Sequence, residues 1–236
     1  MARPGTKNGI LKRLKAEDFN ALEPFLKPVT LSPKQDLSLP GRVVEYVHFI
    51  EEGICSVEAI APGSEAIEVG LIGPEGVTDH VQDPGDTSPL HVLVQVGGSA
   101  LAVRAGDYAN WIEGRLDALR LMVRYQQAMT IQISFTALAH GSFSLEERLS
   151  RLLLMLFDRT EGHDLPFVHE RLARMLSVRR AGVTSALHML EGLHAVKVTR
   201  GIVTLRDRST LETLSAGSYG IPEKEYARLL GSIPQD

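Results

Sequence analysis

The pattern of hydrophobic residues changes once along this 236-residue chain, and that change constrains the fold more than any other feature. Between Val29 and Val103 the chain consists of short β-rich runs, separated by turn pairs such as Pro40-Gly41 and Gly73-Pro74. Regularly spaced short strands are typical of a small barrel or sandwich. After Gly106 the spacing of apolar residues becomes helical. We therefore predict an α+β protein in which a β-rich part precedes a helical part.

Length, composition and cysteine usage exclude several classes of protein. The hydrophobic share of 44% and the charged share of 23% match an ordinary globular chain of one or two domains, and exclude collagen, a disordered tail and a coiled-coil rod. No apolar run approaches the roughly 20 residues that cross a bilayer, and the first residues lack the apolar core of a signal peptide. Cys55, the only cysteine, allows neither an internal disulfide nor an iron–sulfur cluster. We expect a cytoplasmic protein without membrane contact.

A long helix is expected near residues 115–138, because apolar residues recur there at alternating spacings of three and four. The repeating positions are Leu119, Met122, Gln126, Met129, Ile133 and Thr136. Such a seam predicts a helix pair between two copies of the chain, with Gln126 and Thr136 as polar interruptions that set the register. The alternative is a helix that packs on the barrel of its own domain, and one helix can do both.

Residues 165–191 contain the pattern of a helix-turn-helix. Ala173 is the small residue needed where two helices cross, and Ser177 occupies the turn, where this motif usually has glycine. The inward positions are Leu172, Leu176, Val178, Val183 and Leu187. The second helix, expected over about 178–191, would place its N-terminal side chains at base edges in the major groove. Its outward positions are Arg179, Arg180, Ala181, Thr184, Ser185 and His188. The alternative is an ordinary helical hairpin.

Two alternating runs at 196–199 and 202–205 flank Arg200-Gly201 and predict a β-hairpin directly after this motif. Such a wing can reach phosphates, here through Lys197 and Arg200. The chain has a net charge of −4, yet residues 168–208 hold eight basic side chains against three acidic ones. A locally basic segment is what phosphate binding needs, because neutralised phosphates release counterions. Motif, wing and local charge together predict double-stranded DNA as a partner.

From about Leu11 to Leu230 the chain resembles transcription regulators of the bacterial Crp/Fnr family. Residues 46–57 resemble the family's strand pair, residues 70–77 its G-x-I-G-x-E-G-M segment, and residues 172–184 its L-A-x-x-L-G-V-x-R-x-x-V-T motif. The resemblance implies an N-terminal β-roll of the cyclic-nucleotide-binding type over 1–114, a dimerisation helix over 115–140 and a winged helix-turn-helix over 141–236. It also implies a homodimer that reads a pseudo-palindromic operator, with RNA polymerase as a further partner.

The recognition residues depart from those of the family's cyclic-AMP-binding members. Arg180 keeps the first of three base-reading positions, whereas Ala181 and Ser185 replace a Glu and an Arg, so a different operator is expected. Ala181 or the methyl group of Thr184 would contact a thymine methyl. Val168 stands where the family commonly has a threonine that caps the first helix and touches phosphate, and His169 would partly substitute for it.

The resemblance places an effector pocket in the β-roll. Its candidate residues here are Gly73, Glu75, Gly76, Ser88 and His91. Cyclic-nucleotide binders hold the phosphate with an arginine, but no arginine occurs between Arg42 and Arg104. Because a buried phosphate without arginine loses its strongest hydrogen bonds, cyclic AMP is not the expected effector. The alternative is a constitutive DNA binder in which the β-roll is a vestigial sensor that serves dimerisation.

An enzymatic alternative is a cupin-type metal oxygenase that uses His48, His80 and His91. Such sites place two ligands one residue apart on a strand, and the chain has no His-x-His sequence. The same histidines are candidate haem ligands only in principle, and an ordinary structural role for each is favoured. Cys55 is expected to be a buried strand residue rather than a redox switch. We therefore expect no cofactor, no metal site, no catalytic residues and no enzymatic activity.

Overall fold

The computed structural model describes residues 6–64, 66–79, 83 and 85–231. The chain folds into two compact units. Unit 1 comprises residues 1–58, 71–130 and 226–236, and unit 2 comprises 59–70 and 131–225. Both contain helices and sheet, which confirms the predicted α+β class. The predicted domain ranges 1–114, 115–140 and 141–236 stay a prediction.

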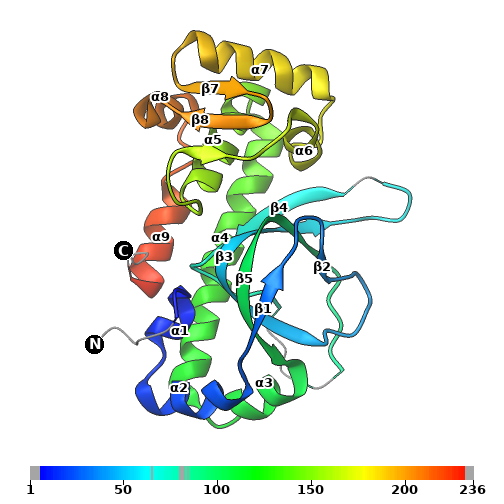
Figure 1. The fold of residues 1–236 in the computed structure, drawn as a ribbon, viewed down its shortest axis with the longest axis vertical. Coiled ribbons are helices and arrows are strands. Elements are labelled where there is room, and N and C mark those ends of the chain that lie inside the picture. Colours follow the sequence, from blue (N-terminus) through cyan, green and yellow to red (C-terminus); the bar gives the residue numbers. More distant parts are fainter. Residues whose placement is uncertain (1–5, 65, 80–82, 84, 232–236) are drawn as a thin grey trace. The chain divides into compact units, whose positions relative to one another are not determined.

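A five-stranded sheet forms the β-roll (Figure 1). Its strands lie in the order β1 (Lys27–Leu31), β5 (His91–Arg104), β3 (Tyr46–Ala59) and β4 (Ile67–Ile72), and β2 (Asp36–Ser38) pairs with β5 beside this path. The two long strands, β3 and β5, pair antiparallel with Val47 opposite Val103. Their register shifts near Glu52, where a Cβ on Gly98 would collide with the Glu52 carbonyl oxygen. The irregularity of this strand pair therefore depends on glycine.

The helices of unit 1 pack on a shared apolar core. They are α1 (Gly9–Arg13), α2 (Ala16–Leu22), the 3-10 turn η1 (Glu23–Phe25), α3 (Ala105–Ile112) and the first part of α4 (Leu116–Ser142). Asn8 caps α1, since its Oδ1 accepts hydrogen bonds from the backbone N–H groups of Ile10 and Leu11, each at 3.0 Å. Tyr108, Phe49 and Met122 are completely buried in this core.

The long helix differs from its prediction at its C-terminal end. Helix α4 continues to Ser142, whereas the sequence predicts that it ends near residue 138. A single glycine costs a helix only about 1 kcal/mol, so Gly141 alone does not end it. The backbone N–H of Phe143 still bonds to the Ala139 carbonyl at 3.1 Å, and the next helix starts only after Ser144.

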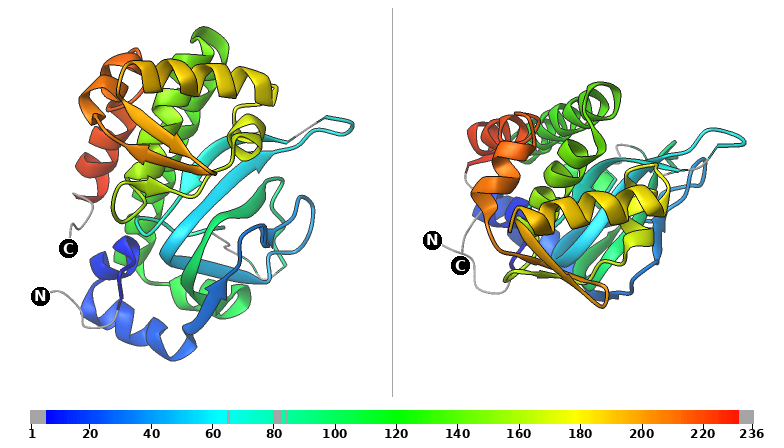
Figure 2. Two further views of the ribbon diagram at one scale, coloured as in Figure 1. Left: turned by 45° about the horizontal axis from the view of Figure 1, so that its top comes forward. Right: turned by 90° about the horizontal axis from the view of Figure 1, so that it is seen from above.

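Unit 2 contains the winged helix-turn-helix. Its helices and strands are α5 (Leu145–Phe157), β6 (Asp164–Leu165), α6 (His169–Met175), α7 (Arg180–Gly192), β7 (Val196–Thr199), β8 (Ile202–Leu205), α8 (Arg208–Leu214) and part of α9 (Ile221–Leu230). A capping box begins α5, because Ser144 N–H donates to Glu147 at 2.7 Å and Glu147 N–H donates to the Ser144 hydroxyl. Figure 2 shows the β7–β8 hairpin beside α7.

Candidate nucleic-acid interface

The turn between α6 and α7 has the backbone geometry that a helix-turn-helix requires. Ser177 has a φ of 53°, in the left-handed region where glycine is favoured. The N–H of Ser177 bonds to the Arg174 carbonyl at 3.1 Å, and the N–H of Val178 bonds to the Ala173 carbonyl at 3.0 Å. Ala173 itself is buried where the two helices meet. The predicted small residue and turn residue are thus both confirmed in their places.

Helix α7 is held by one face and free on the other. Leu172 and Leu176 from the first helix, and Val183 and Leu187 from the second, are buried. The helix runs from Arg180 to Gly192, close to the predicted 178–191, with Arg179 as its N-cap residue. The outward side chains that are exposed are Arg179, Arg180, Ala181, Ser185 and His188. Their exposure leaves a mixed basic and polar row available to another molecule.

Thr184, on the same face, is half-buried and already has two hydrogen-bond partners. Its hydroxyl donates to the Arg180 carbonyl at 3.1 Å. The hydroxyl has one proton, so Nδ1 of His169, 2.9 Å away, must be the donor in their shared hydrogen bond. The Thr184 methyl group is then the part left for an external contact, and Nε2 is the ring nitrogen of His169 left for one. Val168, at the N-cap of α6, makes no side-chain capping bond.

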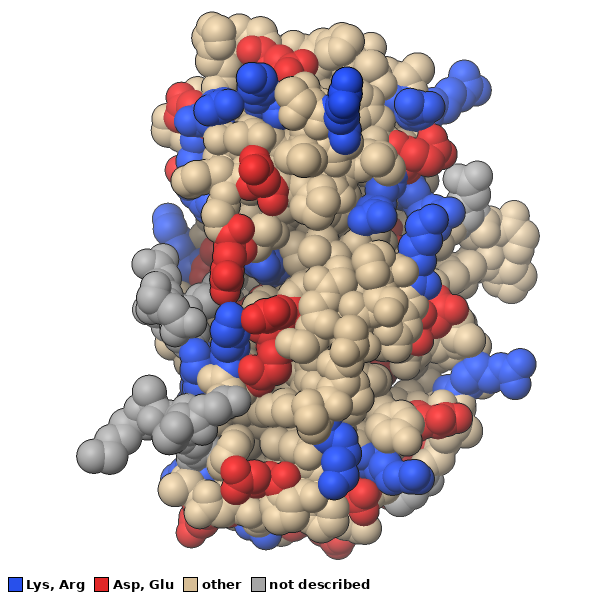
Figure 3. All heavy atoms as spheres, viewed as in Figure 1, with Lys and Arg blue, Asp and Glu red and all other residues tan. Residues whose placement is uncertain are grey.

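The wing has a tight turn with its charged residue at the tip. Arg200 and Gly201 both have positive φ angles, of 42° and 82°, and connect strands in which Val198 lies opposite Val203. This confirms the hairpin predicted at 196–199 and 202–205. Lys197 and Arg200 are exposed. Figure 3 shows Lys and Arg side chains interspersed with carboxylates on the face that carries β7 and β8.

Several residues that the site candidates omitted connect or surround these elements. The Glu191 carboxylate accepts a hydrogen bond from the Val198 N–H at 2.8 Å, which ties the recognition helix to the wing. A shallow hollow of about 360 Å³ lies beside them, and His194, Lys197 and Arg206 are among its lining residues. Side chains that meet across a turn leave no regular spacing in the sequence, so periodicity did not reveal them.

The candidate effector residues of the β-roll lie in two segments. Gly73, Glu75 and Gly76 form a turn after β4, closed by a hydrogen bond from Gly76 N–H to the Gly73 carbonyl at 2.9 Å. The Tyr125 hydroxyl donates to the Val77 carbonyl at 3.0 Å and accepts from the Val77 N–H at 3.2 Å. A Cβ on Gly76 would collide with this hydroxyl. The turn is thereby fixed against α4 by glycine and tyrosine together.

Ser88 and His91 belong to the second segment. The Ser88 hydroxyl accepts a hydrogen bond from the Leu90 N–H at 3.1 Å. His91 lies between two carboxylates, with Nδ1 3.0 Å from Glu58 Oε2 and Nε2 2.8 Å from Asp36 Oδ1. Both ring nitrogens of His91 are therefore engaged within the β-roll. That the two segments line one effector pocket stays a prediction.

Two of the side chains considered for metal or redox chemistry, His48 and Cys55, are buried in the protein. His48 is buried, and desolvation lowers the pKa of its imidazole to about 4. Cys55 is also buried, as predicted, and desolvation with a nearby Glu75 raises the pKa of its thiol to about 12. His80 lies outside the described residues. Within the described ranges, no group of three or more His, Cys, Asp or Glu side chains is arranged to hold a metal ion.

Over the part of the chain that the structure describes, every helix is too short or too polar to cross a lipid bilayer.

The seam predicted on α4 divides between two faces of the helix. Met122 is completely buried in the core of unit 1, and Met129 packs against that core. Gln126 is exposed, while Leu119 and Ile133 are half-buried. Leu116 and Val123 on this helix are exposed by 63% and 53%, which is high for apolar side chains. The alternative of packing on its own barrel therefore applies to Met122 and, in part, to Leu119 and Met129, which pack against the same core.

Comparison with known proteins agrees with this geometry. Residues 147–214 match the family model of the Crp-like helix-turn-helix domain. FixK2 from Bradyrhizobium japonicum superimposes with a TM-score of 0.70 at 15% identity, over 81% of this chain and 98% of its own. TTHB099, a CRP-family transcriptional regulator from Thermus thermophilus, gives 0.65 at 17% identity, over 80% and 97%. No curated protein matches the chain by sequence.

A third solved structure has the same architecture. It is the c-di-GMP-responsive regulator CLP from Xanthomonas campestris, with a TM-score of 0.65 at 14% identity, over 81% of this chain and 99% of its own. The chain is thus a winged helix-turn-helix protein with a β-roll. In its helix-turn-helix domain and its fold it is of the Crp/Fnr type, as the sequence resemblance predicts.

Proposed function

We propose that this protein is a sequence-specific transcription regulator that binds double-stranded DNA as a homodimer, with α7 in the major groove. The observation that carries the proposal is the free face of α7, which presents Arg180, Ala181, Ser185 and His188 while its opposite face is buried. A helix fixed on one side and polar on the other can enter a groove without rearrangement. The Crp-like helix-turn-helix match covers the same segment.

The exposed side chains divide into base-reading and phosphate-binding roles. Arg180 offers a guanidinium suited to guanine O6 and N7, and the methyl groups of Ala181 and Thr184 suit a thymine methyl. Ser185 and His188 complete the base-facing row. Arg179, Lys197 and Arg200 are placed on the phosphates, which position the protein without reading sequence. His169 can join them through Nε2 only as an imidazolium, because its Nδ1–H group is used on Thr184.

The homodimer is proposed to use the exposed face of α4. Leu116, Leu119, Val123, Gln126 and Ile133 recur on it at spacings of three, four, three and seven residues. Burial of Leu116 and Val123 against a second copy would remove apolar surface from water. Two recognition helices about 34 Å apart would then read a pseudo-palindrome. The resemblance adds RNA polymerase as a partner and the cytoplasm as the location.

An unidentified effector in the β-roll is proposed to gate DNA binding. The engaged side chains of His91 and Tyr125 favour a second form of the proposal, in which the β-roll is a dimerisation scaffold and DNA binding is constitutive. Operator affinity of the purified protein separates the two forms. High affinity without cell extract supports constitutive binding, and affinity that requires extract supports an effector.

The experiment that tests the DNA-binding function is selection of bound sequences from a random DNA pool by the purified protein. We expect enrichment of a two-fold repeated half-site. Arg180→Ala should lose the preference for that site over random DNA, whereas Arg42→Ala, which changes an exposed arginine of unit 1, should keep it. A pool that stays random after selection with the wild-type protein contradicts the proposal.

A further inference from the structure

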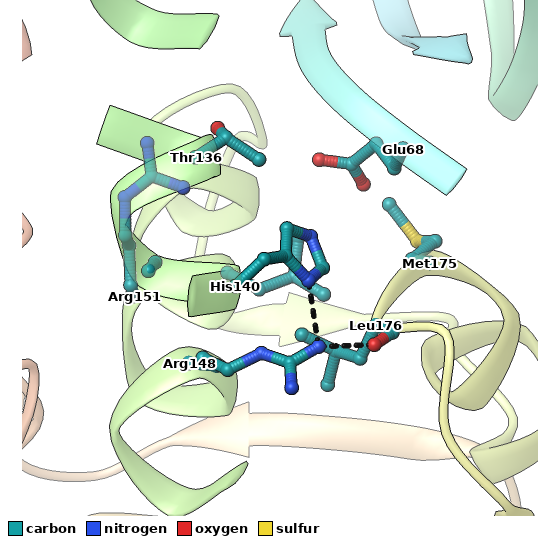
Figure 4. A pocket seen from close by; sticks show the side chains of 9 residues that line it. Glu68, Thr136, His140, Arg148, Arg151, Met175 and Leu176 are labelled. Carbon is teal, nitrogen blue, oxygen red and sulfur yellow. Dashed lines mark hydrogen bonds between the residues drawn. The ribbon is translucent and has the colours of Figure 1, made fainter. Parts of the chain in front are cut away.

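A small polar cavity lies directly behind the helix-turn-helix turn. Its volume is about 20 Å³, enough for one water molecule, and it lies within unit 2. Figure 4 shows Arg148 from α5 hydrogen-bonded both to His140 from α4 and to the carbonyl of Leu176, with Glu68, Arg151 and Met175 around them. None of these side chains is among the residues proposed to touch DNA, so their arrangement needs its own explanation.

The guanidinium of Arg148 connects the turn to α4. Its Nη2 atom donates one hydrogen bond to the Leu176 carbonyl and another to Nδ1 of His140 at 2.8 Å. Leu176 is the C-cap residue of α6 and immediately precedes Ser177, the residue with the left-handed backbone. Arg148 therefore holds the backbone of the turn at the point where its direction changes.

This arrangement requires a neutral imidazole. A guanidinium has only donors, so Nδ1 of His140 must offer a lone pair to Arg148. The His140 ring also makes a hydrogen bond with the Glu68 backbone, which raises the pKa of the histidine. In this bond the other ring nitrogen, Nε2, donates its proton to the backbone carbonyl. Protonation at Nδ1 would place an N–H group against an N–H group of Arg148 and remove one of the two acceptors of Nη2.

The positive charges of two arginines near His140 oppose that protonation in the native state. Arg148 and Arg151 approach it from α5, and Glu68 approaches it from β4. Burial is the main cause that lowers the pKa of His140, followed by the charge of Arg148, and the Glu68 backbone and Arg151 act more weakly in opposite directions. Protonation of His140 in acid therefore disrupts the hydrogen bonds that Arg148 makes with His140 and with the Leu176 carbonyl.

We propose that Arg148 is a positioning residue for the recognition helix and that His140 is its proton-sensitive acceptor, so that acidification frees the Leu176 carbonyl and weakens DNA binding. This inference rests on the proposed DNA-binding function and concerns the regulation of the same site. Loss of a charged hydrogen bond of this kind corresponds to about a tenfold weaker complex. The turn would lose its fixed direction, and α7 would present Arg180 and Ser185 less uniformly to the groove.

The test compares operator affinity at about pH 8 and about pH 5.5, by fluorescence anisotropy, for the wild type and for His140→Asn. Asparagine keeps an acceptor near the Nδ1 position and cannot titrate. Groups at the DNA surface that titrate in this range do so in both proteins, so the ratio of wild-type affinity to His140→Asn affinity isolates His140. We expect this ratio to be about tenfold lower at about pH 5.5 than at about pH 8. The control variant His163→Asn changes an exposed histidine of unit 2, and its operator affinity should depend on pH as that of the wild type does.

A second measurement needs no DNA and so separates failure of the inference from failure of the proposed function. Amide hydrogen exchange of Ser177 and Val178 is compared between the same two pH values, after correction for the intrinsic exchange rates. We expect protection of these amides to fall in acid for the wild type and to stay constant for His140→Asn. Arg148→Met should show low protection at both values. Equal protection in all three proteins at both pH values overturns the proposal, whether or not the protein binds DNA.

Discussion

The two units treat their polar side chains in opposite ways. In the β-roll, His91 is engaged on both ring nitrogens by Glu58 and Asp36. On α7 of unit 2, Arg180 and His188 are exposed, and no hydrogen bond or ion pair of their side chains occurs with the described residues. A polar group that is satisfied inside its own unit must lose a partner before it can bind another molecule. On the proposed function, DNA binding would therefore need no rearrangement of α7, whereas an effector in the roll would compete with internal contacts.

The largest expected effect on stability comes from removing Glu58, which binds His91 and Ser56 inside the β-roll. Glu58→Ala removes the acceptor of both His91 and the Ser56 hydroxyl, which lies 3.0 Å from Glu58 Oε1. Because Glu58 is buried, we expect the free energy of unfolding to fall by about 3–5 kcal/mol, as measured by urea denaturation. Glu113→Ala, at an exposed carboxylate, should change it little. An equal effect of the two substitutions would refute the internal role of Glu58.

A second prediction concerns the acid stability of unit 1. Burial lowers the pKa of His48 from 6.5 to about 4, so the folded state binds a proton less readily than the unfolded state. Stability from this group is present above pH 6.5 and is lost as the pH falls through 6.5 towards 4. The loss amounts to about 3 kcal/mol at most. In His48→Gln the unfolding free energy should fall less between about pH 7 and about pH 4.5 than in the exposed-site control His194→Gln.

The roles of the exposed residues at the start of α7 can be separated by comparing two adjacent arginines. Arg180→Ala should reduce discrimination between operator and random DNA by about 1–3 kcal/mol, because a bidentate base contact is lost. Arg179→Ala should weaken binding to both kinds of DNA alike and should lower the slope of log affinity against log salt by about 1 per subunit, or about 2 for the homodimer. Titrations at several salt concentrations measure both effects. If the two substitutions behave identically, the division into base-reading and phosphate-binding residues is wrong.

The smallest effect is expected at the turn between α6 and α7. Ser177 holds a φ of 53°, which costs a residue with a Cβ about 1 kcal/mol. Ser177→Gly should therefore raise the free energy of unfolding by about 0.5–1 kcal/mol and leave operator preference unchanged. Thermal unfolding monitored by circular dichroism gives the first quantity, and competition binding gives the second. Destabilisation by glycine would show that the serine side chain contributes more than the backbone strain removes.

Local sequence rules predicted unit 2 well. The hairpin at 196–199 and 202–205 and the turn at Ser177 agree with the structure, because each depends on residues within a few positions of one another. The start of the helical part was predicted less well. Helix α3 begins at Ala105, whereas helical spacing in the sequence starts only after Gly106, and Asp107 lies in its first turn, where a carboxylate stabilises the helix.

Contacts between distant residues could not be predicted in this way. His169 with Thr184, Arg148 with Leu176, and His91 with Glu58 join residues on different elements, and no spacing in the sequence marks such pairs. The seam on α4 illustrates a related problem. Periodicity identified Leu119 and Met122 as equivalent, but it contains no information on which face of the helix the rest of the chain covers, and Met122 is the one buried completely.

The tight turn at Arg200 and Gly201 has a consequence for the entropy of binding. Two consecutive positive φ angles close the wing with no spare residue, so the backbone of its tip has few alternative conformations before any partner arrives. A charge carried on a long flexible loop loses backbone freedom when it docks on a phosphate, at about 1–2 kcal/mol per residue fixed. For Arg200 that loss has already occurred during folding, and only the freedom of its side chain remains to be lost on DNA.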